Sequence, residues 1–227
     1  MSTRGRVRAY FANGIMKLVF LRVLCVLRGS SLLLVSLAAM SGCGSSPPVR
    51  FFTLAADPPP AEMTQTSADF SVIVGPVTVP EMVDRPQLVL RSSSSRVEIA
   101  EFARWAAPLK SEIPRVIADH LARLLGGART STSAQRATGL PDYRVLIDVQ
   151  RFESAPNEGV TIQAQWEVRG RSGTPFTGRS LVTEPAGAGY DDLVAAHGRA
   201  LAAVSRDIVA AIGQLRTTPP PRLDAPR

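Results

Sequence analysis

The sequence predicts an α/β fold: a single domain in which a mixed β-sheet is covered by two long helices, in the order strands, helix, three strands, helix. Two stretches, 111–125 and 191–215, carry apolar residues at helical spacing. Residues 160–168 alternate apolar side chains with Thr, Gln and Glu, which predicts one buried and one polar sheet face.

Several short β-rich runs precede the first helix. The strands expected there are residues 51–54, 72–74, 77–79, 88–90 and 97–99. The last two flank Ser92–Ser95, which predicts a hairpin with a four-residue turn. Because no catalytic companion stands near these serines, we interpret them as loop residues and not as nucleophiles.

The first helix is expected to begin near Ser111, a favourable N-cap, and to end at Gly126-Gly127. Glu112 would then lie in the first turn, and Pro114 would be tolerated there because first-turn amides lack intrahelical partners. His120 flanks the apolar face, and we interpret it as a boundary residue and not as a metal ligand.

Three strands and a second helix are expected to follow. The strands are residues 143–149, 160–168 and 176–182, with turn-forming residues between them. The helix is expected to begin at Asp191 or Asp192 and to end at Leu215. Its apolar stripe favours a core position, with a role in binding a partner helix as the alternative.

A lipoprotein signal precedes the domain. Ser41-Gly42-Cys43 follows the apolar run 32–40, which is well short of the roughly 20 residues that span a bilayer as a helix. We therefore predict a signal peptide over residues 1–42 and lipid on the sulfur of Cys43, with no other cofactor. Residues 43–50 would form a tether, 51–216 the domain, and 217–227 a disordered Pro-rich tail. Translation could start at Met1 or at Met16.

Charge and cysteine usage narrow the function classes. The signal peptide holds six of the 26 Lys and Arg residues and none of the 19 Asp and Glu residues, so the remainder carries one net positive charge. The high pI therefore gives no support for nucleic-acid binding. With Cys25 in the signal peptide and Cys43 acylated, no thiol remains for a disulfide, a Cys-ligated zinc site or a nucleophile. His120 and His197 stand alone, and no catalytic motif is present, so we do not expect an enzyme.

Three sequence motifs identify a family. Residues 74–81 have the sequence Val-Gly-Pro-Val-Thr-Val-Pro-Glu, and Asp84-Arg85-Pro86-Gln87 follows. Residues 101–109, Glu-Phe-Ala-Arg-Trp-Ala-Ala-Pro-Leu, contain Trp105, and residues 51–54 read Phe-Phe-Thr-Leu. In order and spacing these motifs resemble the signature of the ABC-type transport auxiliary lipoproteins, the PqiC-like family, over nearly the whole mature chain.

The resemblance implies a non-catalytic accessory subunit of an envelope transport system that moves lipids or other hydrophobic molecules between membranes. Its expected partners are a mammalian-cell-entry (MCE) domain protein, inner-membrane transport components, the bilayer that holds the acyl anchor and further copies of the chain. Gly44 after the acylated cysteine is similar to lipoproteins sorted to the outer membrane, on its periplasmic face. The alternative is a stand-alone periplasmic carrier that binds a lipid between helix and sheet.

Two interpretations remain open for the motif residues Asp84, Arg85, Pro86, Gln87 and Trp105. Asp84 and Arg85 could form a pair that braces a rigid turn, or the segment could contact a partner. Trp105 could pack at the start of the first helix or lie at an interface. We favour the structural interpretation in both cases.

Overall fold

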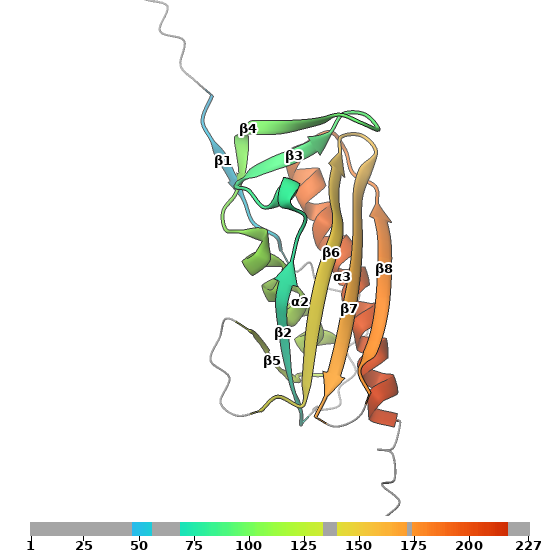
Figure 1. The fold of residues 1–227 in the computed structure, drawn as a ribbon. Coiled ribbons are helices and arrows are strands. Elements are labelled where there is room, and N and C mark those ends of the chain that lie inside the picture. Colours follow the sequence, from blue (N-terminus) through green and yellow to red (C-terminus); the bar gives the residue numbers. More distant parts are fainter. Residues whose placement is uncertain (1–46, 56–68, 134–139, 172–173, 218–227) are drawn as a thin grey trace, which may run out of the picture. The chain divides into compact units, whose positions relative to one another are not determined.

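The computed structural model describes residues 47–55, 69–133, 140–171 and 174–217, which apart from Pro47 lie within one compact unit, Pro48–Arg227 (Figure 1). The predicted signal peptide, Cys43 and the predicted tail after Thr217 lie outside the described residues. Thr217 itself ends a helix, so the tail was predicted to start one residue too early.

The described elements follow each other as a mixed sheet with two α-helices. They are β1 (Arg50–Phe52), β2 (Ser71–Thr78), the 3₁₀ helix η1 (Glu81–Val83), β3 (Gln87–Arg91), β4 (Val97–Trp105), α2 (Leu109–Leu124), β5 (Arg129–Thr132), β6 (Tyr143–Ala155), β7 (Gly159–Gly170), β8 (Phe176–Glu184) and α3 (Tyr190–Thr217). The predicted fold class is therefore confirmed.

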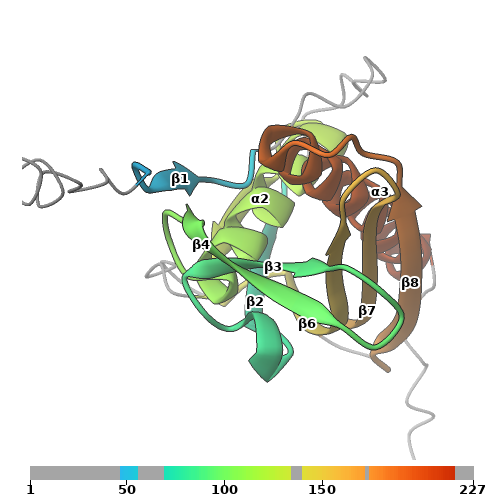
Figure 2. The same cartoon turned by 90° about the horizontal axis from the view of Figure 1, so that it is seen from above.

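Strand β6 organises the sheet. Its first half pairs in parallel with β2, and its whole length pairs antiparallel with β7, which in turn pairs with β8. Near its end Ser154 lies opposite Leu90 of the β3–β4 hairpin, and β1 adds in parallel to β4. Figure 2 shows this hairpin crossing over the ends of β6 and β7.

Strand β5 was not predicted, so four strands and not three separate the two α-helices. Its sequence, Arg-Thr-Ser-Thr, has no apolar residue that could reveal a buried face. It forms because it pairs in parallel with Ser71–Val74 at the edge of β2. Backbone hydrogen bonding to a neighbour, and not side-chain burial, defines this strand.

Both α-helices cover the same face of the sheet, where they lie behind β2, β6 and β7 in Figure 1. The alternation predicted for β7 is confirmed. Val160, Ile162, Ala164, Trp166 and Val168 are buried beneath the helices. The residues between them are partly or fully exposed on the open face.

Helix α2 begins two residues earlier than expected, at Leu109 after Pro108. Pro114 is consequently its sixth residue, beyond the first turn, so the reason given for tolerating it was wrong. A proline there leaves the carbonyl group of Lys110 without its intrahelical partner. The predicted end is confirmed, because Gly126 and Gly127 have φ angles of 65° and 86° and the Gly127 N–H bonds the Ala122 carbonyl.

Gly178 of β8 gives a test of packing between sheet and helix. A Cβ at this position would lie 2.3 Å from the buried indole of Trp166 on β7. That indole donates to Ser180 Oγ, which bonds Asp207 on α3. We expect Gly178→Ala to lower the free energy of unfolding by about 1–3 kcal/mol, because the indole must move out of this network. Urea denaturation measures the change.

Gly213→Ala is the matched control. Gly213 lies on the exposed side of α3, and apart from its chain neighbours and the backbone of its own helix no described atom lies within 4 Å of the position that an added Cβ would occupy. Alanine there should stabilise the domain slightly, by up to about 1 kcal/mol, because it favours the helix. Equal destabilisation by both substitutions would contradict the proposed role of the Trp166 contact.

Candidate functional site

Four of the predicted motif residues, Asp84 to Gln87, lie at the corner where η1 leads into β3. Asp84 donates its backbone N–H to the Pro80 carbonyl, which closes the turn, and its carboxylate lies 2.6 Å from Lys110 Nζ on α2. The structure records no ion pair or hydrogen bond of the exposed Arg85 side chain with any described residue. The expected Asp84–Arg85 pair is therefore wrong, because Asp84 reaches across to α2 instead of to its neighbour.

The start of β3 and the end of β4 are joined by contacts of Pro86, Gln87 and Trp105. The Trp105 backbone N–H donates to the Pro86 carbonyl at 2.6 Å, and Gln87 lies opposite Arg104 in the register. The Trp105 ring is only 6% exposed and lies edge-on to Phe152 at 6.1 Å between centroids. Trp105 thus packs in the core, as the favoured interpretation expected.

A buried serine–histidine pair lies beside Trp105. Ser154 Oγ and His197 Nε2 are 2.8 Å apart, and the His197 ring stacks on Phe152 at 4.0 Å. Burial lowers the pKa of His197 to about 3, so the imidazole is neutral at ordinary pH.

This pair lacks what nucleophilic catalysis needs. His197 is fully buried, Ser154 is 4% exposed, and the buried His197 Nδ1 has no hydrogen-bond partner among the described residues. A catalytic serine–histidine pair needs access to substrate and a third group that orients the imidazole. We therefore assign Ser154 and His197 to the core.

His120 is also fully buried, which corrects its expected place at the boundary of the apolar face. Its Nδ1 lies 3.3 Å from Ser205 Oγ on α3, and Ser205 donates to the Leu201 carbonyl. His120 thus forms part of the contact between α2 and α3. Sequence spacing alone could not reveal this partner, which lies 85 residues away.

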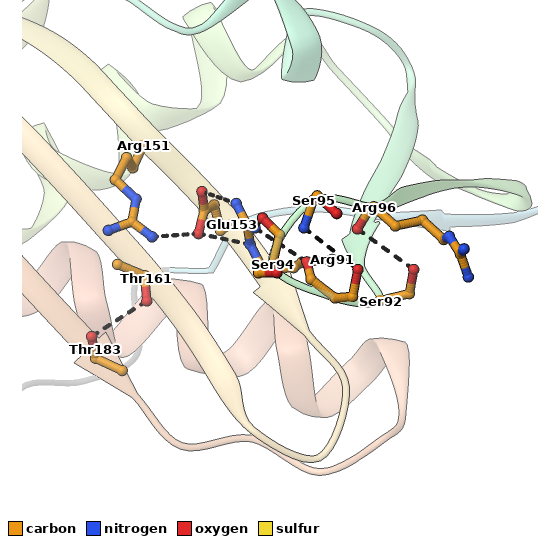
Figure 3. Close-up of polar contacts among 10 residues, drawn as sticks. Arg91, Ser92, Ser94, Ser95, Arg96, Arg151, Glu153, Thr161 and Thr183 are labelled. Carbon is orange, nitrogen blue, oxygen red and sulfur yellow. Dashed lines mark hydrogen bonds and ion pairs between the residues drawn. The ribbon is translucent and has the colours of Figure 1, made fainter.

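A cluster of charged side chains fixes the β3–β4 hairpin to β6 (Figure 3). Glu153 of β6 accepts hydrogen bonds from Arg91 Nε at 3.1 Å and from Arg151 Nη2 at 2.7 Å. Arg91 also donates to the carbonyl groups of Ser93 and Ser94. Burial acts to raise the pKa of Glu153, but the hydrogen bonds from Arg151 and Arg91 outweigh it and hold the pKa below its usual value. The serine tract is thus part of the turn, as predicted.

The open face of the sheet is hollowed over β2, β6, β7 and β8. The hollow has a volume of about 610 Å³ and is lined by apolar side chains such as Leu146 and Trp166 as well as by polar groups such as Asp148, Gln165 and Arg179. Thr78 donates to Asp148 within it. Across the described parts of the chain, no three His, Cys, Asp or Glu side chains come together in a way that could hold a metal ion.

None of the described helices combines the length and apolar character needed to span a bilayer. The predicted lipidation site, Cys43, lies outside the described residues and stays a prediction. The described polar clusters support the fold, and no catalytic constellation is found among them. These observations define the class of protein: a small α/β domain with one covered and one open sheet face.

Comparison with protein families identifies the particular group. The family of ABC-type transport auxiliary lipoprotein components matches residues 52–209, and the chain belongs to this family. None of the curated proteins compared with the chain matches it.

Two crystal structures have a similar fold. One, described only as an uncharacterized protein, is 19% identical with a TM-score of 0.59 over 73% of this chain and 99% of its own. The other, protein XCC0632 from Xanthomonas campestris, is 19% identical with a TM-score of 0.58 over 74% of this chain and 100% of its own. At this identity the similarity concerns the fold alone.

The buried His197 predicts acid sensitivity. Its folded pKa of about 3 lies below the ordinary 6.5, so between these values the unfolded chain binds a proton that the folded chain does not. Stability should therefore be retained above about pH 6.5 and fall by roughly 1.4 kcal/mol per pH unit below it. Urea denaturation at pH 7.5, 6.5, 5.5 and 4.5 measures the slope. His197→Gln should reduce the slope of stability against pH. An unchanged slope in this variant would show that His197 does not cause the acid sensitivity.

The Glu153 cluster predicts local stability of the hairpin. Glu153→Gln removes the charge that holds Arg91 and Arg151, so the β3–β4 hairpin should open more readily, by about 1–2 kcal/mol. Hydrogen–deuterium exchange of residues 88–99 measures the change at neutral pH. Glu167→Gln is the control, because the one ion pair of Glu167 among the described residues is with Arg169 on its own strand, so its loss should leave the hairpin unaffected. Equal hydrogen–deuterium exchange of the hairpin in both variants would contradict the proposal that the Glu153 cluster holds the hairpin to β6.

Proposed function

We propose that this chain is a non-catalytic accessory subunit of an envelope transport system, held to a membrane by lipid on Cys43. The observation that carries the proposal is the family match over residues 52–209, which begins nine residues after the candidate lipidation site. The family is described as an auxiliary component of ABC-type transport. An auxiliary role agrees with a domain whose described serine–histidine pair is buried in the core.

The proposed anchor is a multiply acylated Cys43. A single acyl chain binds a membrane only marginally, whereas two or more give stable residence, at about 0.8 kcal/mol per buried CH₂. Gly44 supports residence at the outer membrane, with the domain on the periplasmic face. The tether of residues 43–50 can extend at most about 28 Å, so the domain would stay close to the bilayer.

The proposed partners are an MCE-domain protein and the inner-membrane components of the same system, which together would move lipids or other hydrophobic molecules between membranes. Copies of this chain would assemble with each other at the partner. The exposed Arg85 at the η1–β3 corner is available for such a contact, because it has no ion pair among the described residues.

The stand-alone carrier has less support. Such a carrier would bind a lipid between helices and sheet, but core side chains such as Ile117 and Leu121 on α2 and Ile162 on β7 occupy this layer. The hollow of about 610 Å³ lies on the open face of the sheet and not in this layer, and polar and apolar side chains line it together. Native mass spectrometry separates the two functions: a stoichiometric bound lipid would favour the carrier.

Lipid attachment is tested by intact-mass analysis of membrane fractions. We expect protein cleaved before Cys43 with the added mass of acyl chains, and Cys43→Ser should abolish both cleavage at this site and the added mass. Cys25→Ser is the matched control, because Cys25 lies within the predicted signal peptide and its loss should leave the mature mass unchanged. Unprocessed wild-type protein would overturn the anchor.

The transport role is tested by association with a partner. Acylated protein solubilised in mild detergent should co-purify with the MCE-domain protein produced from the same organism. Arg85→Glu should weaken this association, whereas Arg179→Glu on the open sheet face serves as a charge-matched control. Failure of the wild-type protein to associate would count against the proposed function.

A further inference from the structure

Exposed apolar side chains gather on two neighbouring strands. The exposed large apolar residues on β1, on β4 and directly before β1 are Val49, Phe51, Val97, Ile99 and Phe102. We call them the β1/β4 apolar patch. Phe51 is 66% exposed and Phe102 is 43% exposed, so the described part of the domain leaves a large share of both side chains open to solvent. Clusters of this kind mark contacts with proteins or membranes.

The register places the two aromatic residues on the same side of neighbouring strands. Phe51 of β1 lies opposite Arg104 of β4, so Phe102 is its diagonal neighbour, within reach of an aromatic side chain. The pairing of β3 with β4 is irregular between Ile99 and Arg104. Within this interval Ala100 and Ala103 face the core, so both Glu101 and Phe102 between them turn outward. The irregularity thus places Phe102 on the outer surface.

The patch lies where a membrane anchor would hold the domain. Cys43 precedes Arg50, the first residue of β1, by seven residues, which can extend no more than about 25 Å. The hairpin and β1 lie at one end of β6, whereas Leu140 precedes the other end (Figure 1). Tyr143 and Ser154 of β6 are eleven positions apart in the chain, which separates the two ends by about 36 Å.

We infer that the β1/β4 apolar patch contacts the phospholipid bilayer in which Cys43 is anchored, so that the domain has a fixed orientation on the membrane. The inference rests on the proposed acylation of Cys43. Charges around the patch have both signs, with Arg96 and Arg104 against Glu98 and Glu101. The contact is therefore apolar, with Phe51 and Phe102 entering the headgroup region, and it does not require anionic lipid.

Fluorescence quenching by lipid tests this orientation. Full-length protein carrying Phe102→Trp or, as an independent reporter, Phe51→Trp is purified in its acylated form and reconstituted in vesicles of phosphatidylethanolamine and phosphatidylglycerol with brominated acyl chains. Leu140→Trp is the control, because Leu140 is 84% exposed but lies beyond the far end of β6. Trp105 and Trp166 are buried, and the unsubstituted protein gives their background signal.

We expect several-fold greater quenching of the reporters at positions 102 and 51 than of the reporter at position 140. Equal or absent quenching at the patch, in protein that floats with the vesicles, overturns this inference and leaves the proposed anchor intact. Protein that neither floats nor carries acyl mass overturns both. Replacing phosphatidylglycerol by phosphatidylcholine should leave the quenching unchanged, and its loss would contradict the apolar nature of the contact.

Discussion

The contact among Trp105, Phe152 and His197 is the constraint on which the hairpin end of the domain depends. These rings belong to β4, β6 and α3, and they meet edge-on or stacked in the core. Trp105 is also the last residue of β4 and stands four residues before α2, so its position determines where the hairpin ends and where the helix begins. Ser154 adds a polar contact here, because its hydroxyl group lies within hydrogen-bond distance of His197 Nε2. The other ring nitrogen, His197 Nδ1, is buried without a hydrogen-bond partner among the described residues.

Much of the fold follows from local patterns. The alternation in β7 and the stripes of α2 and α3 could be predicted because each element reports its own buried face. Strand β6 runs to Ala155, although the sequence predicted its end at residue 149. The prediction stopped there because an irregularity between Val149 and Arg151 shifts the alternation of buried and exposed residues. After this shift Phe152 and Ser154 face inward, which a strict period of two conceals. Strand β5 has no apolar pattern at all, and only its pairing with β2 explains it.

The polar contacts could not be predicted, because their partners lie far apart in sequence. Arg91 and Glu153 are 62 residues apart, and Ser154 and His197 are 43 apart. The sequence did contain one indication that His197 is buried. It continues the helical spacing of Leu193 and Leu201, which lie on the buried side of α3. For Asp84 the motif indicated a structural role, but the partner proved to be Lys110 on α2. The family motifs thus favoured a structural role for Asp84 and Trp105 but did not show which side chains they contact.

Strand β1 also determines how the domain bears mechanical load. It is three residues long and pairs in parallel with the end of β4, from Arg50 opposite Ala103 to Phe52 opposite Trp105. Arg50 packs over the Tyr190 ring, and the Ala106 N–H bonds the Phe52 carbonyl. Any tension applied through the chain before Pro48 reaches the fold through this strand first. Three paired residues and the buried side chains of Phe52 and Leu54 hold β1 in place. Because the paired stretch is so short, we expect β1 to detach under force while the other strands stay paired, so that the chain leading into the domain lengthens before the domain unfolds.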